Sequence, residues 1–109
     1  MTKDEYFKFS EQFFKDCIAT SRKKNNDYTG DTGNPFANLE SCEVLGIKTE
    51  IGILTRMQDK MMRLASFAGG TDMQVTDESI QDTLRDLANY TCLLAGYLSS
   101  KDSEDSSNS

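Results

Sequence analysis

Histidine is absent from this sequence, so the most common general base and the imidazole ligand of zinc sites are both missing. A Ser-His or Cys-His triad is excluded for the same reason. The chain has no apolar run near the roughly 18 residues of a membrane-spanning helix and no signal peptide, which predicts a soluble, cytoplasmic protein without a membrane partner. Any chemistry must therefore use carboxylates, amides, hydroxyls, lysine, arginine or a bound metal.

Cysteine and positive charge are also scarce. The three cysteines, Cys17, Cys42 and Cys92, are an odd number without metal-ligand spacing, and we expect reduced, structural thiols. The net charge of −6 argues against direct binding of duplex DNA. Residues 101–109 contain only Lys, Asp, Glu, Ser and Asn, a composition typical of disorder. We therefore expect one domain over residues 1–100 and a disordered tail over residues 101–109.

Three segments have apolar residues at helical spacing, and none has the alternation of a strand. The segments are residues 3 to about 24, 47–68 and 76 to about 99. Thr2 and Glu5 form a capping-box pattern at the start of the first, and Gly69-Gly70 ends the second. The pattern predicts an all-α bundle of three main helices with a long functional loop between the first and second. We expect oligomerisation to complete its small core.

The apolar positions of these segments define the side chains expected to face the core. They are Ile51, Leu54, Met57, Met61, Leu64 and Ala65 in the second segment, and Ile80, Leu84, Leu87, Thr91, Leu94 and Leu98 in the third. For the first segment we expect Tyr6, Phe9, Phe13 and Cys17 to lie in the core or in a dimer interface. Glu50 also falls on the apolar side of its helix, where an unpaired charge is costly to bury. It is therefore a metal ligand, half of a structural salt bridge, or part of an exposed first turn.

Residues 25–45 are rich in turn-forming residues and contain the only proline, Pro35. Phe36 and Leu39 are expected to anchor this loop, and residues 38–44 to form a short helical turn. The loop also carries amides and aromatic rings that suit the edge and face of a nucleobase. These are Asn25, Asp27, Tyr28, Asn34, Phe36 and Asn38. The alternative is a self-capped surface loop, in which Asn and Asp side chains bond their own backbone.

Two stripes of opposite charge lie on consecutive predicted helices. The acidic stripe consists of Glu78, Asp82 and Asp86, with Asn89 beside them, and the basic stripe consists of Arg56, Lys60 and Arg63. Spacings of four, four and three residues place the acidic stripe on one side of its helix, where like charges repel. A positive charge must neutralise these acids: a Mg²⁺ or Mn²⁺ ion, or the basic side chains of the other helix. The basic stripe accordingly suits either phosphate oxygens or pairing with these acids.

The sequence contains four stretches that are distinctive in combination: Lys24–Tyr28, Asn34–Asn38, Gly52–Leu64 and Asp77–Tyr90. Together they resemble nucleotide modification associated domain 1, a small domain of phages and bacteria, over residues 10–98. The resemblance implies a protein that works in a nucleotide setting.

The third helix also resembles the closing motif of the MazG-like all-α nucleoside triphosphate pyrophosphatases, which bind Mg²⁺ through a Glu-x-x-Glu pair and a Glu-x-x-Asp pair. The sequence departs from that motif, because Glu78 and Asp82 are four residues apart. Thr83 stands where a Glu should precede Asp86, and Ile53 stands three residues after Glu50. These departures predict that metal binding is altered or lost, and that hydrolysis is altered or lost with it.

These resemblances imply a phage-type nucleotide-binding protein whose enzymatic form would be a Mg²⁺-dependent pyrophosphatase-like hydrolase. The implied Mg²⁺ ligands are Glu50, Glu78, Asp82 and Asp86, with Glu50 and Asp82 as catalytic carboxylates. The implied phosphate ligands are Arg56, Lys60 and Arg63, and the implied base-binding residues are Asp27, Tyr28, Asn34, Phe36, Asn38 and Asn89. Two alternatives stay open: a non-catalytic protein that sequesters a nucleotide, such as a host immune signal, and an interaction module whose aromatic first helix docks a partner.

Overall fold

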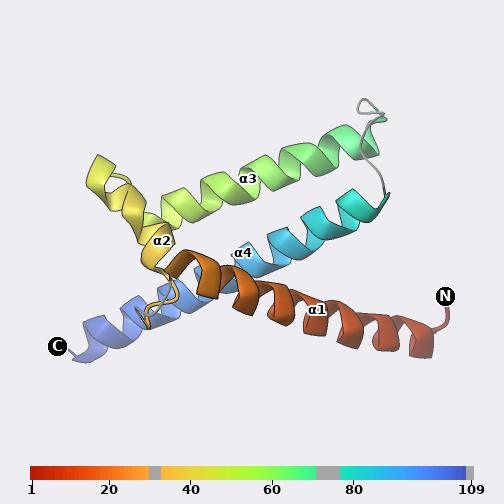
Figure 1. Cartoon of the computed structure of the whole chain (residues 1–109), viewed down its shortest axis with the longest axis horizontal. Coiled ribbons are helices and arrows are strands. Elements are labelled where there is room, and N and C mark those ends of the chain that lie inside the picture. Colours follow the sequence, from red (N-terminus) through yellow and green to blue (C-terminus); the bar gives the residue numbers. More distant parts are fainter. Residues whose placement is uncertain (30–32, 71–76, 108–109) are drawn as a thin grey trace.

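The computed structural model describes residues 1–29, 33–70 and 77–107, and these residues form helices and no strand. The elements are α1 (Lys3–Thr29), α2 (Ala37–Glu40), the 3₁₀ helix η1 (Ser41–Leu45), α3 (Thr49–Ala68) and α4 (Asp77–Ser107) (Figure 1). The predicted all-α class is confirmed. None of the described helices combines the length and apolarity needed to span a membrane.

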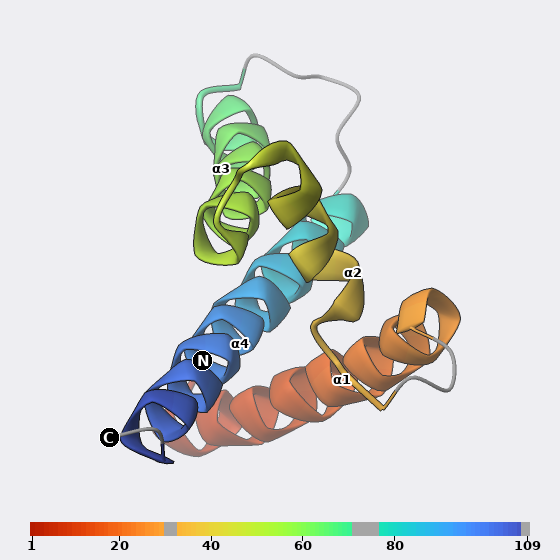
Figure 2. The ribbon, with the colours of Figure 1, turned by 90° about the vertical axis from the view of Figure 1, so that its left-hand side faces the viewer.

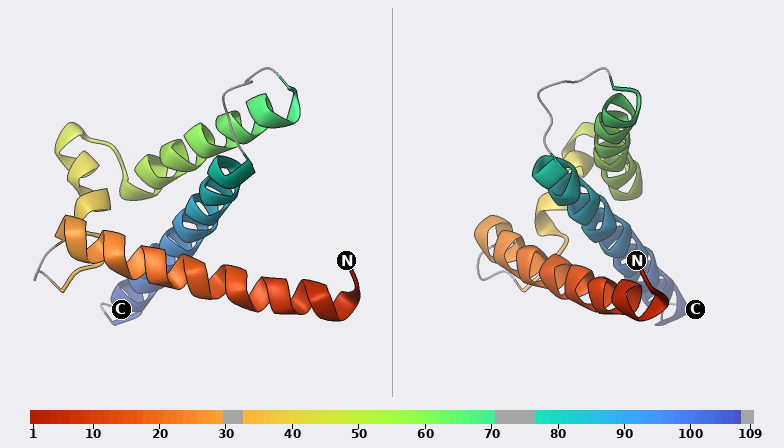
Figure 3. Two further views of the ribbon diagram at one scale, coloured as in Figure 1. Left: turned by 45° about the vertical axis from the view of Figure 1, so that its right-hand side comes forward. Right: turned by 90° about the vertical axis from the view of Figure 1, so that its right-hand side faces the viewer.

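Helix α4 is the element on which the others assemble. Helices α3 and α1 both pack on α4, on different sides of it, and α2 lies between them (Figure 2). In the described part of the chain, the backbones of α1 and α3 do not approach each other. The three long helices therefore form an open arrangement rather than the closed bundle expected from the sequence. The N-terminal half of α1 extends away from the contact with α4 (Figure 3).

Helix α1 begins at the predicted capping box. The Thr2 amide donates to the Glu5 carboxylate at 3.2 Å, and the Glu5 amide donates to the Thr2 hydroxyl at 3.1 Å. The helix ends at Thr29, five residues later than the predicted position near residue 24. Asn25 belongs to this extension, and its side-chain amide donates to the carbonyl of Pro35 at 2.9 Å. This tertiary contact helps to offset the weak helix propensity of the asparagines.

The predicted anchors of the segment after α1 are confirmed. Leu39 is buried in a cluster with Ile53 of α3 and Tyr97 of α4, and the Phe36 ring packs edge-on against the Tyr97 ring at 5.6 Å. The short helical turn expected near residues 38–44 corresponds to α2 and η1. Gly46, with φ of +78°, ends η1 in a left-handed conformation that favours glycine.

Helix α3 buries only part of the face predicted to meet the core. Met57 packs against the core cluster as expected, and Thr49 and Ile53 are fully buried, whereas Ile51, Leu54 and Met61 are 50%, 46% and 53% exposed. The prediction was wrong for these three residues because α3 carries apolar side chains on two sides, and only one of them packs on α4. Periodicity alone does not distinguish two apolar faces from one broad face.

The predicted core face of α4 is also partly wrong. Ile80 is buried as expected, but Thr83 and Tyr97 are buried in place of Leu84 and Leu98, which are 36% and 42% exposed. Helix α4 contacts helices on two sides, so its buried surface is broader than one stripe. Thr83 tolerates burial because its hydroxyl donates to the carbonyl of Ser79 at 2.9 Å.

Gly52 allows η1 to lie directly against α3. A Cβ atom added at Gly52 would lie 2.8 Å from the Sγ of Cys42, too close for any side chain without a shift. The Cys42 thiol in turn lies 3.4 Å from the carbonyl of Leu39. Glycine inside a helix costs about 0.5–1 kcal/mol relative to alanine. At Gly52 this cost is the condition for close packing of η1 against α3.

The C-terminal end of α4 reaches into the segment expected to be disordered. The helix continues through Ser107, so residues 101–107 are helical, and residues 108–109 lie outside the described part of the chain. Lys101 sits above the Tyr97 ring, with its Nζ 5.4 Å from the ring centroid.

We expect Ile53→Ala to lower the free energy of unfolding by about 2–4 kcal/mol, because Ile53 is fully buried between α2 and α4 and its truncation leaves a cavity. Val44→Ala, at a position 90% exposed, is the matched control and should change it by less than about 0.5 kcal/mol. Urea unfolding followed by circular dichroism measures both. Equal effects at the two positions would contradict this packing.

Candidate functional site

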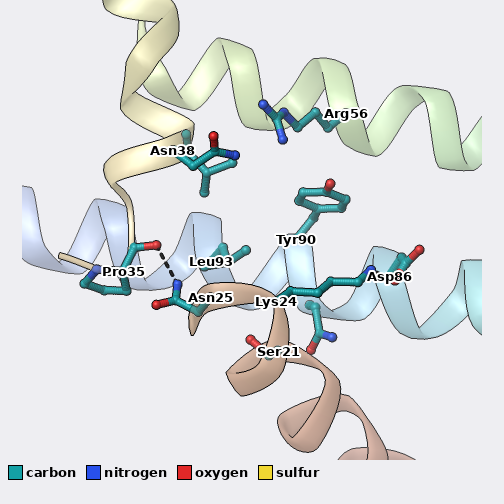
Figure 4. A pocket seen from close by; sticks show the side chains of 11 residues that line it. Ser21, Lys24, Asn25, Pro35, Asn38, Arg56, Asp86, Tyr90 and Leu93 are labelled. Atoms are coloured by element: carbon teal, nitrogen blue, oxygen red, sulfur yellow. Dashed lines mark hydrogen bonds and ion pairs between the residues drawn. The ribbon is translucent and has the colours of Figure 1, made fainter. Parts of the chain in front are cut away.

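A groove opens where the C-terminal half of α1, the segment after it, α3 and α4 meet (Figure 4). Its lining residues are Ser21, Lys24, Asn25, Pro35, Asn38, Leu39, Arg56, Asp86, Asn89, Tyr90 and Leu93. Its cavity volume is about 80 Å³, and the rest of the hollow is open to solvent. Small-molecule sites typically have about 300–1,000 Å³. The cavity is therefore smaller than such a site and has room for one group of a ligand, with the rest of the ligand lying along the open part of the groove.

Asp86 of α4 is held by a lysine from each of two other helices. Its Oδ1 lies 2.9 Å from the Nζ of Lys24 on α1, and its Oδ2 lies 3.4 Å from the Nζ of Lys60 on α3. Partial burial raises the pKa of Asp86, but the Lys24 hydrogen bond and the charges of Lys24 and Lys60 outweigh it. The pKa of this carboxyl is therefore below its ordinary value, and Asp86 is ionised at neutral pH.

Arg56 reaches into the same groove from α3. Figure 4 shows its guanidinium on the side of α3 that faces Asn38 and Tyr90. Among the described residues, no carboxylate lies within ion-pair distance of Arg56. The groove and its margin thus combine three cations, Lys24, Arg56 and Lys60, with the single carboxylate of Asp86. This local excess of positive charge contrasts with the net charge of −6 of the whole chain.

The side-chain amides of Asn25 and Asn89 bond to backbone carbonyls and so hold the walls of the groove together. The Asn25 amide donates to the carbonyl of Pro35 at 2.9 Å and ties the following segment to α1. The Asn89 amide donates to the carbonyl of Cys17 at 3.1 Å and ties α4 to α1. Asn25 and Asn89 therefore help to position the walls. In the close-up, Asn38 faces the groove beside Arg56 (Figure 4).

Six lining residues were not among the sequence candidates for the site: Ser21, Lys24, Pro35, Leu39, Tyr90 and Leu93. Ser21 and Lys24 lie on the face of α1 that also carries Asn25, at the i, i+3, i+4 spacing of neighbours on one side of a helix. The prediction ended this helix near residue 24 and so did not recognise the shared face.

The structure brings together six of the sequence candidates and separates the others. The groove is lined by Asn25, Asn38, Arg56, Asp86 and Asn89, and Lys60 contacts it through Asp86. The remaining candidates with described side chains lie elsewhere: Asp27, Asn34, Phe36, Glu50, Arg63 and Asp82. The side chains of Tyr28 and Glu78 lie outside the described part of the structure.

Most of the separated candidates have identifiable contacts. Arg63 donates to the hydroxyl of Ser79, and the side-chain amide of Asn34 donates to the carboxylate of Glu40 at 2.7 Å. Phe36 packs on Tyr97 and belongs to the core. Asp27 is exposed at the C-terminal end of α1.

The described carboxylates do not form the Mg²⁺ site implied by the sequence resemblance. Glu50 lines a separate hollow with Glu43 and Lys101, and Asp82 pairs with Arg85. Both oxygens of Asp86 are already engaged by lysines. No group of three potential ligands suitable for a metal occurs in the part of the chain that is described. The described residues therefore do not form the Mg²⁺ site that the sequence resemblance implies.

Comparison with protein-family models, curated proteins and solved structures finds no match to this chain. The resemblance to nucleotide modification associated domain 1 therefore stays a prediction from the four sequence stretches.

We expect Asp86→Asn to lower the free energy of unfolding at neutral pH by about 0.5–1 kcal/mol, the range of partly exposed ion pairs. Because the pKa of Asp86 is lowered by folding, its contribution is complete above the unfolded-state pKa of about 3.9 and is lost as the pH falls through the folded-state pKa.

The difference in unfolding free energy between the wild type and Asp86→Asn should thus be constant from about pH 5 to 7 and shrink below about pH 4. Urea unfolding across this range measures it. A difference that persists unchanged at acid pH would show that ionisation of Asp86 is not its source.

Proposed function

We propose that the groove binds a nucleotide, or a closely similar phosphorylated small molecule, without a metal-dependent reaction. The observation that carries the proposal is the excess of positive charge in the groove of an acidic chain. An anion that enters meets Arg56, a planar donor suited to bidentate contacts with phosphate oxygens. Lys24 and Lys60 lie close by, fixed by Asp86.

The other walls of the groove suit the remainder of a nucleotide. Tyr90 offers an aromatic ring, and Leu39 and Leu93 add apolar surface against which a base can lie. Asn38 offers an amide that both donates and accepts, as recognition of a base edge requires. The resemblance of four sequence stretches to a nucleotide-associated domain supports the same ligand class.

Binding without hydrolysis is favoured over the pyrophosphatase alternative by the placement of the acids. Phosphoanhydride hydrolysis of that type requires carboxylates that converge on Mg²⁺. Among the described side chains, the acid that lines the groove is Asp86, and two lysines occupy it. A protein of this design would hold its ligand intact, which is the chemistry of sequestration.

The direct test is a thermal-shift screen of nucleoside mono-, di- and triphosphates and cyclic nucleotides, each with Mg²⁺ and with EDTA. A ligand that binds the folded state raises the melting temperature by mass action. We expect a shift that EDTA does not remove and a ligand that chromatography recovers intact. Mg²⁺-dependent release of phosphate or pyrophosphate would favour the hydrolase. A melting temperature that no nucleotide changes would contradict the proposal.

Arg56→Gln should weaken binding of the ligand found in that screen by about 10- to 100-fold, the equivalent of one charged hydrogen-bonding contact. Arg63→Gln is the matched control, since it removes the same charge from the same helix but its guanidinium bonds Ser79 outside the groove. It should change the affinity by less than about threefold, because exposed distant charges are screened. Isothermal titration calorimetry compares them. Equal losses of affinity in the two variants would mean that the ligand responds only to the net charge of the protein, and this would contradict a specific role for Arg56.

A second candidate function, docking of a partner protein, is favoured by the aromatic residues of α1. Tyr6, Phe7, Phe9 and Phe14 are each about half exposed. Contiguous exposed apolar surface of this kind marks interaction sites in soluble proteins.

This candidate predicts that Phe14→Ser abolishes a complex with a partner co-purified from the native cell. Phe14 is 57% exposed, so the substitution should change the free energy of unfolding by less than about 0.5 kcal/mol. Lys15→Ser, one residue further along α1 at an exposed position, is the control and should leave the complex intact. Survival of the complex with Phe14→Ser would remove this candidate.

A further inference from the structure

We propose that the outer face of α3 is a self-association surface, on which a second copy of this chain packs through its own α3. The outer face includes those members of the predicted apolar stripe that the structure turns away from the core, namely Ile51, Leu54, Met61 and Ala65. It consists of Ile51, Leu54, Gln58, Met61 and Ala65, with Met62 at its edge.

The spacing of this stripe is that of helix-to-helix packing. Its members follow one another at intervals of three, four, three and four residues, the heptad pattern of apolar seams between helices. From Ile51 to Ala65 the seam extends over fifteen residues, about 21 Å along the helix axis. A helix with a second apolar seam, separate from its core side, is expected to bury both.

The chemistry of the seam favours an identical partner. It contains no charged side chain, so two copies meet without the like-charge repulsion that a charged seam would cause against itself. Its central polar residue is Gln58, and an amide both donates and accepts, so it can pair with the same amide of a second chain. A single polar residue within such a seam is a recognised determinant of register.

The exposed area is adequate for a small dimer. Ile51, Leu54, Met61 and Met62 are 50%, 46%, 53% and 61% exposed, and Ile47, just before α3, is 40% exposed. Together these side chains offer on the order of 500 Å² per chain, so two copies would bury about 1,000 Å² in total, the lower limit for a specific interface. The polar side of α3, with Arg56 and Lys60, is not part of the seam, so the groove stays accessible in the dimer.

Sedimentation equilibrium of the full chain should give twice the mass of one chain. Leu54→Lys and Leu54→Glu, at a half-exposed position that tolerates a charge in the monomer, should each raise the dissociation constant by about 100-fold or more because each dimer contains two altered positions. Gln81→Lys, at an exposed position on α4, is the control and should remain dimeric. Circular dichroism confirms that each variant is folded.

Mixing the two variants identifies the partner surface. An equimolar mixture of Leu54→Lys and Leu54→Glu should recover dimers that contain one chain of each, because opposite charges then meet across the seam. A monomeric wild type, a single variant that stays dimeric, or a mixture that stays monomeric would each overturn the proposal. The last outcome would mean that the outer face of α3 packs against a different surface, such as the aromatic side of α1.

Discussion

The carboxylate of Asp86 is the interaction on which the described arrangement depends. Helices α1 and α3 do not contact each other, so their relative position depends on α4 and α2, each of which contacts both of them. Asp86 lies on α4 and binds Lys24 of α1 through one oxygen and Lys60 of α3 through the other. Partly exposed ion pairs contribute little to stability, about 0–1 kcal/mol. Their effect here is mainly geometric, because they fix two ammonium groups at the mouth of one groove.

The same arrangement explains why a negative chain has a site suited to an anion. The one described acid in the groove is neutralised twice, and Arg56 adds a further positive charge. The field of the whole molecule opposes the approach of an anion, so recognition must come from contacts at short range. Tyr90, Leu93 and Asn38 supply such contacts beside the charges, in the pattern of apolar walls with a few polar groups that small-molecule sites share.

The sequence predicts what depends on local chemistry and fails where tertiary packing decides. The capping box of Thr2 and Glu5 and the anchoring of Leu39 follow from neighbouring residues and are found as expected. The orientation of α3 does not follow, because two of its sides are apolar and only the contact with α4 distinguishes them. The contribution of α1 to the groove was missed because its asparagine-rich end reads as a loop. The sequence predicts that Glu50 joins the acidic stripe in binding a metal, but in the structure Glu50 lines a separate hollow that does not include Asp86.

The projecting N-terminal half of α1 has a consequence for how the chain folds. An isolated helix shorter than about 12–15 residues is marginal in water, and little tertiary packing supports this half. Its order therefore depends on the capping box at one end and on continuity with the packed half, which includes the buried Cys17, at the other. Amide hydrogen exchange along α1 thus becomes slower from the first turn towards Cys17. We therefore expect the N-terminal half of α1, which carries the exposed aromatic side chains, to open locally more readily than the helices that line the groove.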